Sequence, residues 1–133
     1  MEKNIESNFT EIEEKKVYIV NNDIQTRKWI SKIPFLKSTI NLEESDIVLF
    51  TGGEDVSPIL YNQKLHPYSN CKLQRDIYEH EIFKKSKDKL KLGICRGGQF
   101  LCVMSNGQLI QHISHSSEKN NIHTIENNFL VEN

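Results

Sequence analysis

The chain reads LKLGICRGGQFLCVM from residue 90 to residue 104, so a glycine-flanked cysteine separates two short apolar runs. Lys91 to Ile94 is typical of a strand, and Gly97 to Met104 is typical of a helix start. Cys95 falls at the turn between them. The pattern G-x-C-x-G predicts a nucleophile elbow, because so tight a turn needs glycine two residues before and two residues after the nucleophile.

An elbow would make the Cys95 thiol reactive. The sharp turn places the sulfur at the C-terminal edge of a sheet, where open α/β folds bind their ligands. The free N–H groups and the dipole at the start of the following helix favour the thiolate over the thiol. The backbone N–H of Arg96 would face the oxyanion that forms on a substrate carbonyl. We therefore predict Cys95 as the nucleophile and Arg96 as an oxyanion-hole donor.

A second glycine turn strengthens this prediction. Alone, G-x-C-x-G is a weak signal, since a buried cysteine at a helix start is as often inert filling. Upstream, Ile47 to Phe50 is a continuous apolar run that predicts a buried parallel strand, and it ends at Thr51-Gly52-Gly53. A glycine there lets a carbonyl oxygen approach the backbone. We favour a true elbow and predict the Gly53 N–H as the second oxyanion donor.

Strands and helices alternate through the rest of the chain, which predicts an α/β domain with a mostly parallel sheet. Asp23 is predicted to cap a short helix. The helix over 73–89 is predicted to carry Leu73, Ile77, Tyr78 and Phe83 on one side and its charges on the other. The predicted strands cover residues 16–20, 35–40, 47–50, 91–94 and 109–113, the predicted helices cover 24–31, 73–89 and 97–104, and a loop covers 56–70.

The composition is that of one soluble domain. The chain has 133 residues, of which 37% are hydrophobic and 26% charged, and this suffices for one core. A net charge of -1 disfavours nucleic-acid binding, and no apolar run reaches the length of about 18 residues that predicts a membrane span. Residues 1–14 are polar and lack signal-peptide features, so we predict a flexible leader, a domain over 15–133 and a cytoplasmic location.

The cysteines and histidines predict neither a disulfide framework nor a metal site. Three cysteines are an odd number at spacings that match no zinc pattern. Cys71 and Cys102 have no visible activator and are interpreted as structural residues. Three of the histidines, at positions 112, 115 and 123, could be imagined as ligands, but their spacing fits no known pattern. We therefore expect no metal and no cofactor. The five histidines are His66, His80, His112, His115 and His123.

Four ordered motifs make the chain resemble a known family. The motifs are GGEDVSPILY from Gly52 to Tyr61, Arg75-Asp76 with Glu79, GICRGGQ from Gly93 to Gln99, and NGQLIQ from Asn106 to Gln111. They resemble the class I glutamine amidotransferase superfamily, and within it the gamma-glutamyl-gamma-aminobutyrate hydrolase type, over Lys16 to about His123. Two positions depart from the family pattern: Asn106 replaces a glycine and Cys102 replaces an asparagine.

The resemblance implies a flavodoxin-like three-layer sandwich and hydrolysis of a gamma-glutamyl amide bond through a cysteine thioester. It implies that Cys95 is the nucleophile and that Gly53 and Arg96 are the oxyanion donors, as the local sequence pattern also predicts. It also implies that Gln99 and Gly52 contact a small-molecule gamma-glutamyl substrate. Arg75, Asp76 and Glu79 either brace the site or form a plain ion pair on a helix surface.

One departure concerns the catalytic base. The family completes its triad with a histidine and an acid, which cysteine acyl transfer needs to move protons. Phe129 to Val131 resembles the strand that leads to this histidine, and the sequence stops at Asn133. The resemblance thus implies that the C-terminal part of the fold lies outside this sequence, so that a synthetase or a C-terminal fragment is a possible partner. The alternatives are a catalytically incomplete binding or scaffold protein, and a protein with a redox-reactive cysteine.

Overall fold

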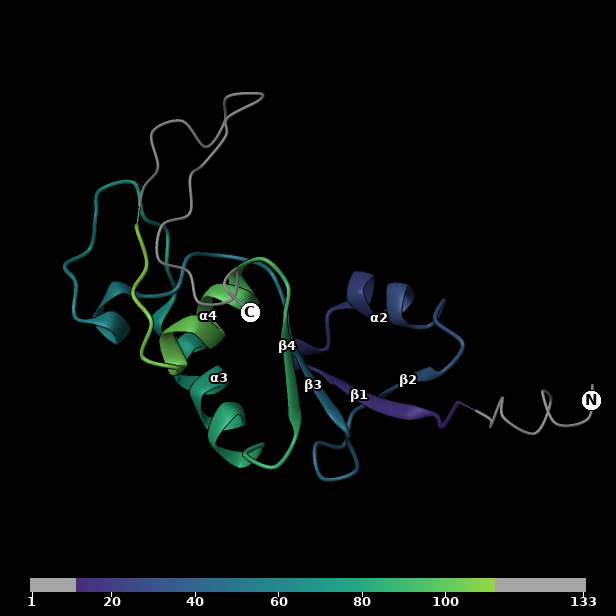
Figure 1. The fold of residues 1–133 in the computed structure, drawn as a ribbon. Coiled ribbons are helices and arrows are strands. Elements are labelled where there is room, and N and C mark those ends of the chain that lie inside the picture. Colours follow the sequence, from purple (N-terminus) through teal and green to yellow (C-terminus); the bar gives the residue numbers. More distant parts are fainter. Residues whose placement is uncertain (1–11, 112–133) are drawn as a thin grey trace, which may run out of the picture.

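The computed structural model describes residues 12–111, which form a four-stranded parallel sheet with helices on both faces (Figure 1). The strand order is β2-β1-β3-β4. This arrangement confirms the predicted α/β, flavodoxin-like fold class. The strands are β1 (Lys15–Ile19), β2 (Leu36–Thr39), β3 (Ile47–Phe50) and β4 (Leu90–Gly93); the helices are α2 (Ile24–Ile30), α3 (Leu73–Lys85) and α4 (Arg96–Met104); and two short 3-10 helices are η1 (Val20–Asn22) and η2 (Pro58–Tyr61).

The local sequence signals account for most of these elements. The predicted strand over 47–50 is β3 residue for residue, and its apolar side chains make it buried on both faces. The Asp23 side chain accepts a hydrogen bond from the Thr26 amide at 2.7 Å, so the predicted cap of α2 is confirmed. Phe50 pairs with Gly93, and the Ile94 amide donates to the Phe50 carbonyl at 2.9 Å. The C-terminal ends of β3 and β4 therefore lie side by side.

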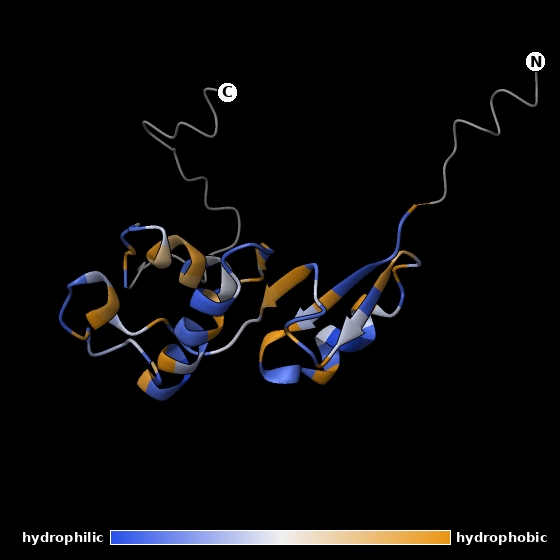
Figure 2. Ribbon diagram, turned by 90° about the horizontal axis from the view of Figure 1, so that it is seen from below, coloured by the Kyte–Doolittle hydropathy of each residue, from blue (hydrophilic) through white to orange (hydrophobic). Residues whose placement is uncertain are grey.

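One face of the sheet is closed by α3 and α4. Phe50 of β3 stacks on Phe100 of α4, with ring centroids 5.3 Å apart. Phe83 of α3 meets the same Phe100 ring edge-on at 6.5 Å. Figure 2 shows apolar strand segments in orange beside helices that carry much blue. The helix that follows Cys95 is therefore fixed to the sheet by aromatic packing. The buried residues of this core are Val20, Val48, Phe50, Val56, Tyr61, Ile82, Phe100 and Val103.

The other face is only partly covered, by α2. This helix packs near β2, on the face of the sheet opposite α3 and α4 (Figure 1). Ile30 of α2 is buried there with Leu49 of β3. Over β4 the same face stays open: Leu92 is 47% exposed, and Trp29 is 53% exposed beside it. Parallel sheets are normally covered on both faces, so this part of the sheet is less covered by residues 12–111 than is usual. An apolar cavity of about 240 Å³ lies in it, lined by Val17, Trp29, Ile30, Leu36, Ile47, Leu49, Leu92, Gly93 and Ile94.

The predicted orientation of the helix after residue 73 is wrong. The helix itself exists as α3, but it ends at Lys85 rather than at residue 89. Its predicted apolar side is mostly open, with Leu73 47% and Ile77 55% exposed. The buried side instead carries Asp76 and Glu79, which are fully shielded from solvent. The amphipathic pattern predicted the wrong buried side for α3, because these two carboxylates have charged partners inside the fold.

Two further predictions concern the ends of the chain. Residues 109–111 of the predicted strand 109–113 are not in a strand, and residues 112–113 lie outside the described residues. The predicted leader lies mostly outside them too, so the division into a leader over 1–14 and a domain over 15–133 stays a prediction. Within residues 12–111, no helix is both long enough and apolar enough to cross a membrane.

Candidate active site

Cys95 occupies the strand-to-helix turn that the sequence predicts. One residue, Ile94, separates it from β4, and it is the N-cap of α4. Its backbone has φ 54° and ψ -115°, a combination that an L-residue adopts only under strain. Its side chain is exposed rather than packed in the core. A strained, accessible cysteine at this position has the geometry of a nucleophile elbow.

The two elbow glycines are required by close backbone contacts. A Cβ atom at Gly93 would collide with the backbone of Gly97 and Gly98. A Cβ atom at Gly97 would collide with the Phe50 carbonyl group and would lie 3.0 Å from the Phe50 Cβ. Glycine at these two positions lets α4 start directly against β3 and β4. These contacts agree with the steric reason for which glycine was expected two residues before and two residues after Cys95.

The loop after β3 lies beside the nucleophile. A Cβ atom at Gly52 would lie 3.8 Å from the Cβ of Cys95. The next residue, Gly53, has φ 143°, in a region that favours glycine. Among the described residues, neither the Gly53 amide nor the Arg96 amide donates a hydrogen bond. Two backbone amides without a hydrogen-bond partner in this part of the chain therefore belong to the elbow and to the loop beside it, and their role as an oxyanion hole stays a prediction.

The Arg96 side chain is buried in a network of charges. It is 2% exposed, and its two terminal nitrogens donate to Asp76 Oδ1 and to Glu79 Oε2. Asp76 also accepts hydrogen bonds from the Ser57 amide and hydroxyl. Of the two interpretations left open for these acids, the structure supports a brace beneath the elbow, because neither carboxylate reaches the surface. No sequence pattern had identified the Arg96 side chain as their partner.

A second arginine holds the glycine loop. Arg75 Nη2 donates to the Gly52 carbonyl at 2.7 Å, and Arg75 Nε donates to Glu79 Oε1 at 3.2 Å. Arg75 Nη1 forms an ion pair with Glu54 at 2.9 Å. The Glu54 carboxylate also pairs with Lys72 at 2.7 Å. Positive and negative groups alternate along this chain of contacts, so each buried charge is compensated.

Acid sensitivity should follow from Glu54. The hydrogen bond from Lys72, a backbone donor and Arg75 lower the pKa of this carboxyl from 4.5 to about 2. A lowered pKa in the folded state gives stability that is complete above pH 4.5 and is lost as the pH falls toward 2. We expect Glu54→Gln to flatten the fall of the urea midpoint across this interval. Glu44→Gln, at a 55% exposed carboxylate, is the control; equal slopes for Glu54→Gln and wild type would contradict the prediction.

A polar cavity of about 420 Å³ opens next to Gly52, at the C-terminal ends of β1 and β3. The chain leaves these neighbouring strands in opposite directions along the sheet, which is where open α/β folds place ligands. Both signs of charge face this cavity. Its lining residues are Asn21, Asp23, Thr51, Gly52, Glu54, Lys72, Gln74, Arg75 and Tyr78.

The predicted substrate contact Gln99 lies on α4 and lines a different, smaller cavity of about 90 Å³. Gln111 borders the same cavity and organises the loop before α3. Its Oε1 accepts from the His66 amide at 2.7 Å, and its Nε2 donates to the Lys64 carbonyl at 2.7 Å. Sequence reasoning did not single out Gln111, although it closes the last of the four motifs.

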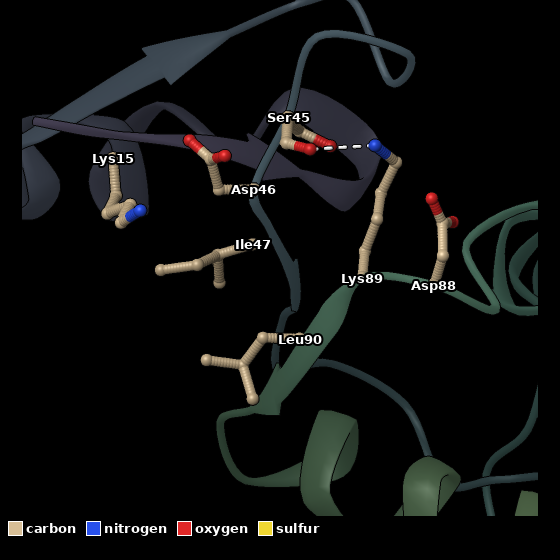
Figure 3. A pocket seen from close by; sticks show the side chains of 7 residues that line it. All are labelled: Lys15, Ser45, Asp46, Ile47, Asp88, Lys89 and Leu90. Carbon is tan, nitrogen blue, oxygen red and sulfur yellow. Dashed lines mark hydrogen bonds between the residues drawn. The ribbon is translucent and has the colours of Figure 1, made fainter.

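A further cavity, of about 450 Å³, lies at the opposite edge of the sheet. Figure 3 shows its lining, with Lys89 reaching across to Ser45. Lys89 Nζ donates to the carbonyls of Ser45 at 2.7 Å and of Glu43 at 3.2 Å. The lysine thus ties two loops at the N-terminal ends of the strands. We assign this cavity a structural role, since ligands of parallel sheets bind at the other edge.

The remaining cysteines and histidines form no second site within residues 12–111. Cys71 forms an isolated bridge with Asp55, and Cys102 is an exposed residue of α4. No group of three or more histidine, cysteine or acidic residues in the described part of the chain could hold a metal ion. His80 lies on α3, and His66 in the loop before it. The other three histidines, at 112, 115 and 123, lie outside the described residues.

Comparison with known proteins identifies the family. The family model described as Peptidase C26 matches residues 32–132, more than half of the chain. The chain belongs to the peptidase C26 family. This finding, with relatives named as glutamine amidotransferase-like, confirms the resemblance to the class I glutamine amidotransferases. Cys95, Gly52 and Gly53 all lie within the part that the peptidase C26 model matches.

Curated relatives are longer than the region that they share with this chain. The glutamine amidotransferase-like protein RP404 of Rickettsia prowazekii is 42% identical over 87 residues, which cover 61% of this chain and 31% of that protein. Protein NtpR of Enterococcus hirae is 33% identical over 76 residues, covering 55% and 32%. The glutamine amidotransferase-like protein YvdE of Lactococcus lactis is 38% identical over 81 residues, covering 56% and 33%. The chain therefore matches about a third of each relative.

Proposed function

We propose that this chain carries the nucleophile and oxyanion donors of a site that hydrolyses gamma-glutamyl amide bonds. The observation that supports this most is an exposed Cys95 in strained elbow geometry, while the Gly53 and Arg96 amides have no hydrogen-bond partner within residues 12–111. The Cys95 sulfur would attack the side-chain carbonyl carbon of glutamine or of a gamma-glutamyl amine. The negative charge on the carbonyl oxygen would be held by the Gly53 and Arg96 N–H groups.

Collapse of this intermediate would break the C–N bond. The amine would leave with a proton from a general acid, and a gamma-glutamyl thioester would remain on Cys95. Water would then attack the thioester carbonyl, releasing glutamate and restoring the thiolate. The polar cavity beside Gly52 suits the charged amino-acid end of such a substrate, since it presents Arg75 and Lys72 as well as Glu54. A cytoplasmic location would keep the Cys95 thiol reduced.

We propose that the base and acid come from polypeptide outside the described residues, either a C-terminal fragment or a partner such as a synthetase. The half-covered sheet face and the free outer edge of β4, which lacks a strand partner within residues 12–111, offer a place for it. The relatives carry about two thirds of their length beyond the matched region, in agreement with this arrangement.

Site-specific labelling tests the proposed function. We expect 6-diazo-5-oxo-norleucine to label one cysteine, Cys95, with loss of N₂ from the reagent, and glutamine to protect it. Intact mass with peptide mapping measures this. Cys102 is an internal control, because it is an exposed thiol on the same helix. Cys95→Ala should fold and take no label. Equal labelling of Cys71, Cys95 and Cys102, or none, would refute the proposal and favour a binding or scaffold protein.

A further inference from the structure

Glu79 contacts both arginines of the site. It lies on the buried side of α3 and is fully shielded from solvent. Its Oε1 accepts from Arg75 Nε at 3.2 Å, and its Oε2 accepts from Arg96 Nη1. Asn21 Nδ2 donates to the same Oε1 at 3.2 Å. One carboxylate therefore joins the glycine loop after β3 to the first residue of α4.

On one side, Arg75 determines the direction of the Gly53 N–H. The Gly52 carbonyl and the Gly53 amide belong to the same planar peptide unit, in which C=O and N–H point in opposite directions. Arg75 Nη2 holds the Gly52 oxygen at 2.7 Å, and a Cβ atom at Gly53 would fall on the Arg75 guanidinium. Because glycine allows this peptide to rotate, the arginine grip is what fixes the Gly53 donor. A charged donor on the carbonyl also strengthens the N–H as a donor.

On the other side, the Arg96 guanidinium anchors the residue that carries the second donor. Arg96 is the first residue of α4, and its backbone N–H is free within the described part of the chain. Its side chain ends between Asp76 and Glu79 of α3. Within residues 12–111, the Asp76 carboxylate forms no hydrogen bond or ion pair with the Arg75 side chain; apart from Arg96, it accepts from Ser57. Glu79 is thus the acid of this pair that accepts hydrogen bonds from both arginine side chains.

We propose that Glu79 is a positioning residue, which fixes the spacing and direction of the two oxyanion-hole amides through Arg75 and Arg96. This inference rests on the proposed function in one respect, namely that the two amides bind an oxyanion. The mechanical link itself is a property of the fold. It explains why a carboxylate is buried in a helix whose apolar residues Leu73 and Ile77 face solvent.

The test compares Glu79→Gln with Asp76→Asn by amide NMR of the ¹⁵N-labelled protein. Both variants neutralise a fully buried acid that binds Arg96, so their cost in stability should be similar. Glu79→Gln should shift the resonances of both Gly53 and Arg96. Asp76→Asn should shift Arg96 and leave Gly53 in place. A Gly53 resonance unmoved in folded Glu79→Gln, or moved equally by Asp76→Asn, would overturn the proposal.

A chemical readout separates this proposal from the proposed function. Glu79→Gln should slow labelling of Cys95 by 6-diazo-5-oxo-norleucine about 10- to 100-fold, while alkylation by iodoacetamide, which needs no oxyanion hole, stays near the wild-type rate. If wild type takes no label, the proposed function fails, and the resonance test still decides the role of Glu79. If Glu79→Gln does not fold, Arg75→Lys replaces it: an unmoved Gly53 resonance there overturns the proposal.

Discussion

Gly97→Ala is expected to destabilise the fold by about 3 kcal/mol or more, at the upper end of the effect of overpacking. The new Cβ would collide with the Phe50 carbonyl group. Phe50 cannot move aside, because it ends the central strand β3 and its carbonyl accepts the Ile94 amide at 2.9 Å. Helix α4 would have to leave the sheet. Urea unfolding followed by circular dichroism measures the loss.

Gly98→Ala is the matched control for this change. It places the same methyl group one residue further along α4, where the nearest atom, the Gly93 oxygen, is 3.6 Å away. That is ordinary van der Waals contact, so the variant should be as stable as wild type or gain up to about 1 kcal/mol from the better helix propensity of alanine. Equal stability of the two variants would show that α4 does not rest on β3 as described.

The sequence predicted those parts of the fold whose signals are local. The strand 47–50 and the helix cap at Asp23 were predicted because an apolar run and a capping side chain act on their own neighbours. The predicted strand 109–113 was wrong for its described residues, 109–111. Residues Leu109 to Gln111 instead line a cavity and hold a loop, through contacts with residues far away in the sequence. Such contacts leave no periodic pattern.

The site was predictable to a similar degree. The elbow around Cys95 was visible because its glycines answer a steric demand within a few residues. The brace was not, since Arg96 contacts Asp76 and Glu79 across 20 and 17 positions of sequence, respectively. Helical periodicity predicted that the side of α3 with Asp76 and Glu79 faces solvent, whereas this side is buried. The signal that could have found the brace was the pair of acids at positions 76 and 79, about one turn apart on the side of α3 that also carries Ile82.

These two kinds of feature act on different parts of the site. The glycines allow the strand and the helix to approach each other, and this sets the exposed, strained backbone of Cys95. The buried charges then fix two parts of the backbone that glycine alone would not fix. Arg75 holds the peptide between Gly52 and Gly53, and the Arg96 side chain holds the first turn of α4. Because each arginine has an acid partner within the fold, the network can be dry without leaving an unpaired charge. Replacing Arg96, which contacts both buried acids, therefore tests how much this network stabilises the fold.

Arg96→Met is expected to cost about 3–5 kcal/mol of stability, the usual effect of removing one partner from a buried ion pair. The methionine fills a similar volume and keeps contact with Phe100, whose ring centroid lies 5.7 Å from the Arg96 Cζ. It leaves Asp76 and Glu79 buried without the positive charge that separates them. Urea unfolding at neutral pH measures the loss.

Two variants distinguish charge from shape at this position. Arg96→Lys keeps the charge but offers one ammonium group where the guanidinium reaches both acids, so its stability should lie between wild type and Arg96→Met. Arg27→Met removes an arginine of α2 that forms no ion pair within residues 12–111, and it should change stability by no more than about 0.5 kcal/mol. An Arg96→Met protein as stable as Arg27→Met would mean that the acids are solvated, and that α3 presents another side to the sheet than the one described.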